Sequence, residues 1–464
     1  MRLSTLLTYS RGKNLFLPAH GRGNSLPPNL KKLLKNRPGI WDLPELPDIG
    51  GPFCSNGAIA ISQKNAALAM GVDRCWYGVN GATGLLQAAL LSIAKPNQAV
   101  LMPRNVHRSI VQACLIGEII PVFFDLPFLK DRGHFIPPDE IWLNKVLKED
   151  IVSTLDIAGL IVVSPSYHGY SNDLTALIKT AHEKNWPVLV DEAHGAHFAA
   201  NVDSTLPKSA LNSCADLVVH SLHKSSIGLS QTAVLWSQGD LIDPLRIERS
   251  VGWLQTSSPN ALLLASCEES IFAWRTKAGK KKLLTRLNQA KEIFSSLRLK
   301  GMPLLQNQDP LRLILHTGSR GITGFKADEC FIKRSIVGEL PEPATLTFCL
   351  GFSRHRDLIR LMKIEWDYIV ENFSEVPFKP FPPSPFPLVS IPKISSSAAS
   401  RANSEQVCIE DAVGKISSDL ICPYPPGIPF LIPGELIDQA RADWLLEQRN
   451  YYTNQISPSI NVVC

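Results

Sequence analysis

Short apolar runs alternate with longer amphipathic stretches between about residue 57 and residue 280. The stretches 81–94 and 172–185 have the apolar spacing of helices. Strands that are apolar on both faces and alternate with helices predict a mainly parallel sheet covered on both sides. We therefore expect an α/β fold in which residues 1–280 form an N-terminal segment and a large domain. The strand-like runs are NQAVLM (97–102), IIPVFFD (119–125), IAGLIVVS (157–164), WPVLVD (186–191) and ADLVVH (215–220).

The rest of the chain is predicted to form three further units. Residues 281–375 combine helix-like stretches with two apolar runs, PLRLILHT and ATLTFCLGF, which predicts a small α/β domain. Proline and serine are frequent in residues 376–405, and this composition favours an extended or mobile linker. Residues 406–464 contain a helix, a proline-rich turn and a second helix, which predicts a C-terminal α+β unit.

Composition and charge exclude several classes of protein. With 464 residues, 45% hydrophobic and 19% charged, the chain is long enough for two or three globular domains. The net charge is only +5, and the basic cluster Lys277–Lys282 has no interleaved aromatic residue, so no nucleic-acid partner is expected. The chain lacks an uncharged apolar run of about 18 residues, so no membrane span is expected. Ten scattered cysteines without a CxxC pair predict no metal site and reduced thiols, as in the cytoplasm.

Residues capable of chemistry follow three of the predicted strands. Ser164 ends one strand and Asp191 ends the next, while Lys224 comes shortly after the run ADLVVH. Ligands of open parallel sheets bind at the carboxyl ends of the strands, so we expect these side chains to meet. The glycine-containing loop 78–84 precedes a helix, and free backbone N–H groups at such a position bind anions.

Lys224 lies between two runs that are predicted to be buried. Burying an unpaired ammonium is costly unless its pKa falls. An anion-binding loop, a strand-end aspartate and a strand-end lysine are the groups that a pyridoxal phosphate enzyme needs. The loop binds the phosphate, the aspartate keeps the pyridine nitrogen protonated, and the lysine links the aldehyde as a Schiff base. The alternatives are that Lys224 reaches solvent from a loop and that Asp191 caps the next turn.

Several motifs, spread over nearly the whole chain, resemble those of the pyridoxal-phosphate-dependent ornithine/lysine/arginine decarboxylases. This resemblance implies the aspartate-aminotransferase-like fold for the large domain. The motif around the Schiff-base lysine of that family is Ser-x-His-Lys. The matching residues are Val79-Asn80-Gly81-x-Thr83-Gly84, Arg104-Asn105-x-His107-x-Ser109, Asp191-Glu192-Ala193-His194-Gly195-Ala196-His197, Ser221-x-His223-Lys224, Pro423-Tyr424-Pro425-Pro426-Gly427 and Pro433-Gly434-Glu435.

The resemblance implies a role for each matching position. Lys224 would bind the cofactor as a Schiff base, and Asp191 would pair with its ring nitrogen. His107 would stack on the face of the ring. His223 or Lys224 would supply a proton to the product. A structural hydrogen-bonding role is the alternative for the histidines. Strand alternation turns Glu192 to the opposite face, so we leave it out. The catalytic set is His107, Asp191, His223 and Lys224. The cofactor-binding set is Ala82, Thr83, Gly84, His107, Ser164, Asp191, Ala193, His194, Ser221, His223 and Lys224.

Departures from the family pattern concern the substrate more than the cofactor. Ala82 replaces a small hydroxylated residue of the phosphate loop, and Leu222 replaces a common threonine, which costs little if it faces the core. The segment 48–52 stands where an acidic, histidine-containing stretch is usual. The shorter architecture, without a preceding receiver-like domain, resembles the biosynthetic arginine decarboxylases.

This resemblance predicts decarboxylation of arginine to agmatine and carbon dioxide, a step of polyamine biosynthesis. Lysine or ornithine as the substrate, aminotransfer by the same cofactor, and an inactive regulatory or binding protein are the alternatives. Enzymes of this fold usually build each site at a dimer interface, so we expect a homodimer or a multiple of it.

Overall fold

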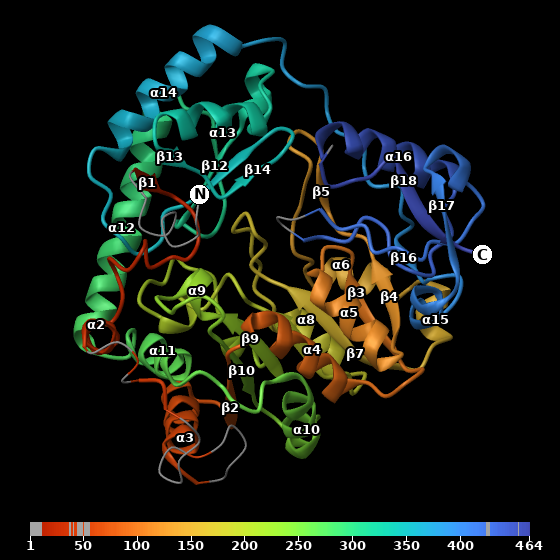
Figure 1. Cartoon of the computed structure of the whole chain (residues 1–464), viewed down its shortest axis with the longest axis horizontal. Coiled ribbons are helices and arrows are strands. Elements are labelled where there is room, and N and C mark those ends of the chain that lie inside the picture. The colour runs from red at the N-terminus through yellow and green to blue at the C-terminus, as the bar shows by residue number, and fades with distance from the viewer. Residues whose placement is uncertain are drawn as a thin grey trace.

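The structure is a computed structural model, and it describes residues 12–36, 39, 41–43, 50, 56–423, 427–452 and 454–464. Three units are visible in Figure 1: a large domain below, a small domain at the upper left and a C-terminal unit at the right. Among the described residues, no helix is long and apolar enough to cross a bilayer.

An eight-stranded sheet forms the centre of the large domain. Five strands that are adjacent in space, β4, β3, β7, β8 and β9, run parallel to one another. The outer strands β16, β10 and β2 are each antiparallel to the strands they pair with. The prediction of a mainly parallel sheet is therefore confirmed. In spatial order the strands are β16 (Val389–Ser390), β4 (Ile120–Phe124), β3 (Ala99–Pro103), β7 (Ile157–Val163), β8 (Val188–Asp191), β9 (Leu217–Ser221), β10 (Ala233–Ser237) and β2 (Arg74–Gly78).

Helices cover both faces of this sheet, because successive strand residues point to opposite sides. Along β8, Val188 and Val190 enter one apolar core, whereas Leu189 enters the other. The core that contains Leu189 is closed by α4 (Gly81–Ile93), α5 (Arg108–Gly117) and α10 (Pro244–Leu254). The opposite core is closed by α3 (Ala58–Met70), α6 (Glu140–Val146), α8 (Thr175–His182) and α11 (Ala261–Phe272), and α7 (Asp150–Ser153) lies between α6 and β7 in the chain.

The small domain is an antiparallel four-stranded sheet packed against three helices. The long helix that leads into this domain begins at Lys277, before residue 281, where the small domain was predicted to start. The strands in spatial order are β11 (Leu304–Leu305), β12 (Arg312–Leu315), β15 (Leu346–Cys349) and β14 (Leu340–Pro341). The helices are α12 (Lys277–Leu299), α13 (Gly324–Lys333) and α14 (Leu358–Phe373).

The N-terminal segment joins the small domain rather than the large sheet. Strand β1 (Lys13–Asn14) pairs in parallel with β13 (Ile336–Val337), and Leu15 is fully buried in the small-domain core. The following helix α2 (Pro28–Lys35) packs its Leu30 against α11 of the large domain. The start of the chain therefore connects the two domains.

The Pro/Ser-rich stretch 376–405 contains regular elements. Its β16 pairs with β4 at the edge of the large sheet, and α15 (Ser396–Arg401) packs beside α5, where the Ser397 hydroxyl donates to the Leu115 carbonyl. The C-terminal unit that follows pairs β17 (Ser404–Cys408) with β18 (Ser459–Val463) and includes α16 (Gln439–Tyr451). Residues of the predicted linker thus attach the C-terminal unit to the large domain.

A buried ion pair also joins the C-terminal unit to the large domain. The Arg104 guanidinium donates from Nη1 and Nη2 to the two oxygens of Glu435, at 2.6 and 2.9 Å, and both side chains are 3% exposed. The guanidinium also lies 3.9 Å from the centre of the Phe386 ring. This bidentate geometry fixes the orientation of one unit against the other.

We expect Arg104→Met to lower the free energy of unfolding by about 3–5 kcal/mol, because it leaves the Glu435 carboxylate buried without its cation. Urea denaturation followed by circular dichroism measures the change. The control is Arg401→Met, whose partner Glu118 is half exposed, and which should cost about 0–1 kcal/mol. Equal effects of the two variants would contradict the prediction.

Candidate active site

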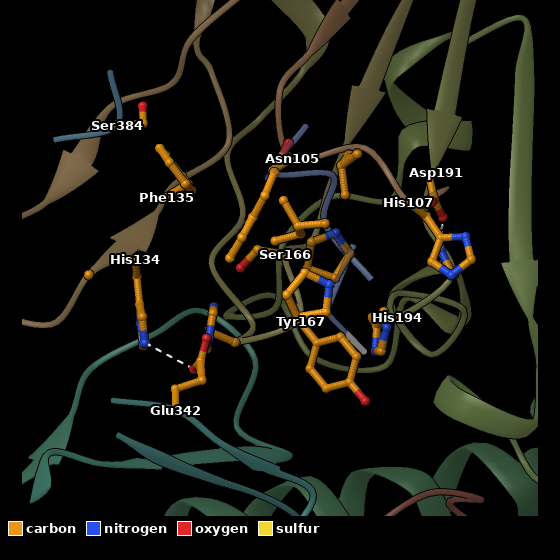
Figure 2. A pocket seen from close by; sticks show the side chains of 18 of the residues that line it. Asn105, His107, His134, Phe135, Ser166, Tyr167, Asp191, His194, Glu342 and Ser384 are labelled. Carbon is orange, nitrogen blue, oxygen red and sulfur yellow. Dashed lines mark hydrogen bonds and ion pairs between the residues drawn. The ribbon is translucent and has the colours of Figure 1, made fainter. Parts of the chain in front are cut away.

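A cavity of about 280 Å³ opens at the carboxyl ends of the central strands. Its walls come from all three units: loops of the large domain, Glu342 and Pro343 of the small domain, and Trp444 and Tyr452 of the C-terminal unit. Figure 2 shows Asp191, His107 and His194 on one side of this cavity, with His134 and Glu342 on the other. The placement agrees with the strand-end position expected for ligands of such a sheet.

Nine of the eleven residues predicted to bind a cofactor line the cavity. They are Ala82, Thr83, His107, Asp191, Ala193, His194, Ser221, His223 and Lys224. The other two, Gly84 and Ser164, are buried beside it. The Ser164 hydroxyl lies 3.1 Å from the Ser171 hydroxyl, and Gly84 packs so tightly that a Cβ there would lie 3.2 Å from the Gln255 side chain. Neither position belongs to the lining of the cavity.

Lys224 lies in the short helix α9 (Leu222–Ser225), directly after β9. Its Nζ atom is 3.4 Å from His194 Nε2 and 5.9 Å from the centre of the Tyr167 ring. Burial lowers the pKa of this lysine, and the negative charges of Asp191 and Glu339 oppose that shift only in part. A lysine with a lowered pKa offers a neutral amine, which is the form that attacks a carbonyl group.

Asp191 is the last residue of β8, and its side chain is buried at the cavity. Its Oδ1 accepts a hydrogen bond from the Ala193 amide at 3.1 Å. Burial raises the pKa of Asp191, while the Lys224 charge and this hydrogen bond lower it. Within the described residues Asp191 forms no ion pair, so a cationic group bound in the cavity would stabilise its ionised form.

Arg312 and Lys224 hold His194 in one orientation. Arg312 of β12 donates from Nη2 to His194 Nδ1 at 3.1 Å. An arginine can only donate, so Nδ1 accepts, and the hydrogen of the neutral ring is on Nε2, facing Lys224. Burial, Lys224 and Arg312 together keep the pKa of His194 well below its usual value. His194 is therefore neutral at physiological pH and presents an N–H group to the lysine.

The N-terminus of α4 and His107 also line the cavity. The side chain of the N-cap residue Asn80 makes no capping hydrogen bond, and the first turn of α4 has no acidic residue. The Gly81 amide donates to the Gln231 carbonyl at 2.8 Å, so the following amides and the helix dipole can act on an anion. His107 accepts from the Ser109 amide at 3.2 Å, and burial first, then Lys224 and Arg108, lower its pKa to about 3. Its ring is neutral.

The remaining positions of the lysine motif support Lys224. The Ser221 hydroxyl lies 3.2 Å from His223 Nδ1, and burial lowers the pKa of His223 to about 4. Leu222 is buried in the core of the large domain, the condition under which its replacement of threonine costs little. Glu192 was left out of the site, and its carboxylate indeed lies elsewhere: it accepts from the Ser209 hydroxyl and lies 2.7 Å from His220 Nε2.

Other cavity residues were not selected from the sequence. Tyr167 and His168 follow the same strand as Ser164, so the strand-end argument could have found them. His134 and Glu342 line the cavity, and Arg312 lies directly behind His194. No local motif marks these three. Two further sequence features lie outside the described residues: the segment 48–52, apart from Gly50, and Tyr424–Pro426 of the proline-rich motif.

Two domain models of one protein family match most of the chain. The major domain of Orn/Lys/Arg decarboxylase matches residues 41–317, and the C-terminal domain of Orn/Lys/Arg decarboxylase matches residues 384–454. The chain belongs to the Orn/Lys/Arg decarboxylase family. The predicted family and enzyme class are therefore confirmed, and the substrate class of this decarboxylase family is a basic amino acid. The match to the C-terminal domain begins inside the predicted linker, shortly before β16.

Curated relatives of this Orn/Lys/Arg decarboxylase extend over nearly its full length. The arginine decarboxylase of Bacillus anthracis is 26% identical over 454 residues, covering 92% of this chain and 88% of that protein. The arginine decarboxylase of Bacillus subtilis is 28% identical over 447 residues, covering 93% and 89%.

Solved structures support the fold of this family member. The constitutive lysine decarboxylase of Escherichia coli has a TM-score of 0.71 at 17% identity, covering 90% of this chain and 74% of that one. Lysine decarboxylase A from Pseudomonas aeruginosa has a TM-score of 0.74 at 16% identity, covering 96% and 81%. The predicted fold class is confirmed.

Membership of the decarboxylase family implies pyridoxal 5′-phosphate as the cofactor, and the cavity fits this molecule at three points. Asp191 supplies a buried carboxylate for a ring nitrogen that carries a proton. The uncapped start of α4 supplies amides for a phosphate, which offsets the hydroxyl missing at Ala82. Lys224 supplies an amine of lowered pKa at the same cavity.

Proposed function

We propose that this enzyme decarboxylates L-arginine to agmatine and carbon dioxide, with pyridoxal 5′-phosphate held in the described cavity. The convergence of Lys224, Asp191, His107 and the start of α4 on one cavity is the observation that carries the proposal. The choice of arginine is supported by the curated relatives, several of which are named arginine decarboxylase.

Each residue would act on a different part of the cofactor. Lys224 would bind it covalently, Asp191 would pair with its ring nitrogen, and the amides of Ala82 and Thr83 would hold its phosphate. His107, neutral and held by Ser109, would lie against the ring. When bound, the cofactor supplies a sink for the electrons that the departing carbon dioxide leaves on Cα.

The same residues would control water and protons. His194, held by Arg312, directs its Nε2–H at Lys224 Nζ and keeps the lysine facing the cavity. Aromatic side chains of the Pro/Ser-rich stretch 376–405 and of the C-terminal unit also line the cavity, where they would exclude water. Among them are Phe381, Phe430 and Trp444. Lys224 or His223 would deliver the proton that replaces carbon dioxide at Cα.

We further propose a homodimer in a reducing compartment such as the cytoplasm. The two-fold arrangement is the commonest among oligomers of soluble proteins. All nine cysteines in the described part of the chain are free thiols, four of them at least partly exposed, which favours a reducing environment.

The substrate is tested by incubating the holoenzyme separately with arginine, lysine and ornithine. We expect agmatine and carbon dioxide from arginine, with the highest kcat/KM of the three. A higher kcat/KM for lysine or ornithine would overturn the choice of arginine but keep the reaction. Release of carbon dioxide from none of them, by a protein that shows the cofactor's visible absorbance, would overturn the decarboxylase function itself.

A further inference from the structure

The cavity contains a carboxylate that the proposed chemistry does not use. Among the described residues that line it, only Asp191 and Glu342 are acidic, and Asp191 is assigned to the cofactor ring. Glu342 lies in the loop between β14 and β15 of the small domain. Figure 2 shows it on the side of the cavity away from Asp191, with Tyr167 between them. Lys224 and Glu342 line the same cavity, so a ligand attached at Lys224 shares that cavity with Glu342.

The hydrogen bonds of Glu342 leave one oxygen available. His168 Nε2 lies 2.7 Å from Oε2, the Thr345 hydroxyl donates to Oε2 at 3.1 Å, and His134 Nε2 lies 3.2 Å from it. No described residue donates a hydrogen bond to Oε1. Three contacts on Oε2 fix the carboxylate in place. A ligand that binds Oε1 therefore does not have to order the Glu342 side chain first.

Glu342 is ionised, and its ion-pair contacts within the described residues are to the histidines His168 and His134 alone. Burial would raise the pKa of Glu342, yet its contacts with His168 and His134 hold that pKa far below its usual value. His134 itself is buried, and its pKa is lowered to about 4, so it is neutral at physiological pH. No lysine or arginine of the described residues lies within 4 Å of Glu342. Buried carboxylates are normally paired with a cation.

The ligand atoms of His134, His168 and Glu342 lie within 4.8 Å of one another, a spacing that could also hold a metal ion. The two imidazole rings are stacked, with centres 3.7 Å apart and planes inclined by 16°. Both Nε2 atoms contact the same carboxylate oxygen, so the rings point in the same direction. With a hydrogen on Nε2 each ring donates to that oxygen. Stacked rings of this kind suit the positioning of a carboxylate.

The cavity that contains Glu342 has an aromatic lining that suits a planar cation. Phe135, Phe381, Phe430 and Tyr452 line the same cavity, and the Tyr452 hydroxyl is close enough to Glu342 for its pKa to be raised by that charge in addition to burial. Aromatic faces attract a guanidinium, which can stack on a ring while it donates to a carboxylate. An ammonium would use the carboxylate but gain less from the flat rings.

We propose that Glu342, held by His134 and His168, binds the distal cation of the substrate and thereby selects a basic amino acid, with preference for a guanidinium. This inference rests on the proposed function, because it assumes that the α-amino group of the substrate is placed near Lys224.

The experiment uses the holoenzyme and its Glu342→Gln variant, which removes the charge but keeps the shape of the side chain. We expect kcat/KM for arginine to fall at least 10-fold, mainly through KM, with the visible absorbance of the bound cofactor unchanged. We also expect the wild-type preference for arginine over citrulline, its uncharged analogue, to shrink by the same factor. An unchanged preference in Glu342→Gln would overturn the proposal.

Agmatine binding separates this inference from the proposed function, since it requires no turnover. Isothermal titration should give a dissociation constant for agmatine that is at least 10-fold higher in Glu342→Gln, while that of butylamine, which lacks the guanidinium, is unchanged. If agmatine binding depends on Glu342 in this way but the wild type does not decarboxylate arginine, the proposed role of Glu342 is supported and the proposed decarboxylase function is rejected. Equal agmatine affinity in an enzyme that decarboxylates arginine would reject the cation site alone.

Two further variants complete the test. Glu329→Gln removes an exposed charge from α13 of the same domain and should leave both measurements unchanged. Glu342→Asp keeps the charge and should restore part of the preference for arginine. If Glu342→Gln does not fold, the wild type still decides: equal kcat/KM values for arginine and citrulline would overturn the proposal.

Discussion

Lys224→Ala is expected to abolish both the visible absorbance of the enzyme and its turnover. Lys224 is the amine at the cavity whose pKa is lowered by burial, and it lies 3.4 Å from His194 Nε2, at the end of β9. Without it the cofactor has no covalent attachment, even where Asp191 and the amides of α4 still hold it. Loss of a positioned proton-transfer group alone reduces rates by about 10²–10⁴-fold, and loss of the covalent link adds to this.

The measurement combines absorbance, borohydride reduction and release of carbon dioxide. Wild-type protein treated with borohydride should carry the cofactor permanently at the peptide that contains Lys224, whereas Lys224→Ala should carry none. The control is Lys208→Ala, which removes an exposed lysine that donates to Thr175 and should leave all three measurements unchanged. A Lys224→Ala protein that keeps the absorbance band and turns over arginine would reject the assignment of this lysine.

The sequence was sufficient for those parts of the fold that depend on local patterns. The runs ending at Asp191 and at His220 are buried on both faces, and such runs predict strands of a parallel sheet wherever they occur. Because Asp191 and Lys224 follow adjacent strands β8 and β9, their proximity also followed from the order of the strands. This part of the candidate site needed no information from other domains.

Other parts depend on contacts between segments far apart in the chain. Arg312 meets His194 across the boundary between two domains, and Glu342 reaches the cavity from a loop between two short strands. Neither residue carries a local signal, since a strand that begins with arginine or a loop with glutamate is common. The strand β16 was also missed, because a two-residue edge strand is set by its partner β4 and its proline-rich neighbours favour a linker.

Asp191→Asn is expected to reduce turnover strongly while leaving the stability of the cofactor-free protein intact. Asparagine cannot supply the negative charge that keeps a ring nitrogen protonated, and a hydrogen bond to a charged group contributes about 1.5–3 kcal/mol. This corresponds to a loss of about 10-fold to 150-fold in kcat/KM, to which the weaker electron sink adds. The cofactor should still be attached through Lys224, so the visible absorbance should remain, with an altered maximum.

The effect on stability has the opposite sign from that of most buried aspartates. The pKa of Asp191 is raised in the folded protein, chiefly by burial, so above its folded pKa the ionised side chain opposes folding. Replacing it by asparagine removes that cost, and the cofactor-free variant should be as resistant to urea as the wild type at pH 7, or more so.

Asp309→Asn is the matched contrast, because Asp309 is fully buried and pairs with His197 at 3.1 Å, and its pKa is lowered. That variant should lose about 3–5 kcal/mol of stability. If Asp191→Asn instead behaved like Asp309→Asn, with lost stability and retained kcat, Asp191 would be a structural residue and the cofactor ring would have to bind elsewhere in the cavity.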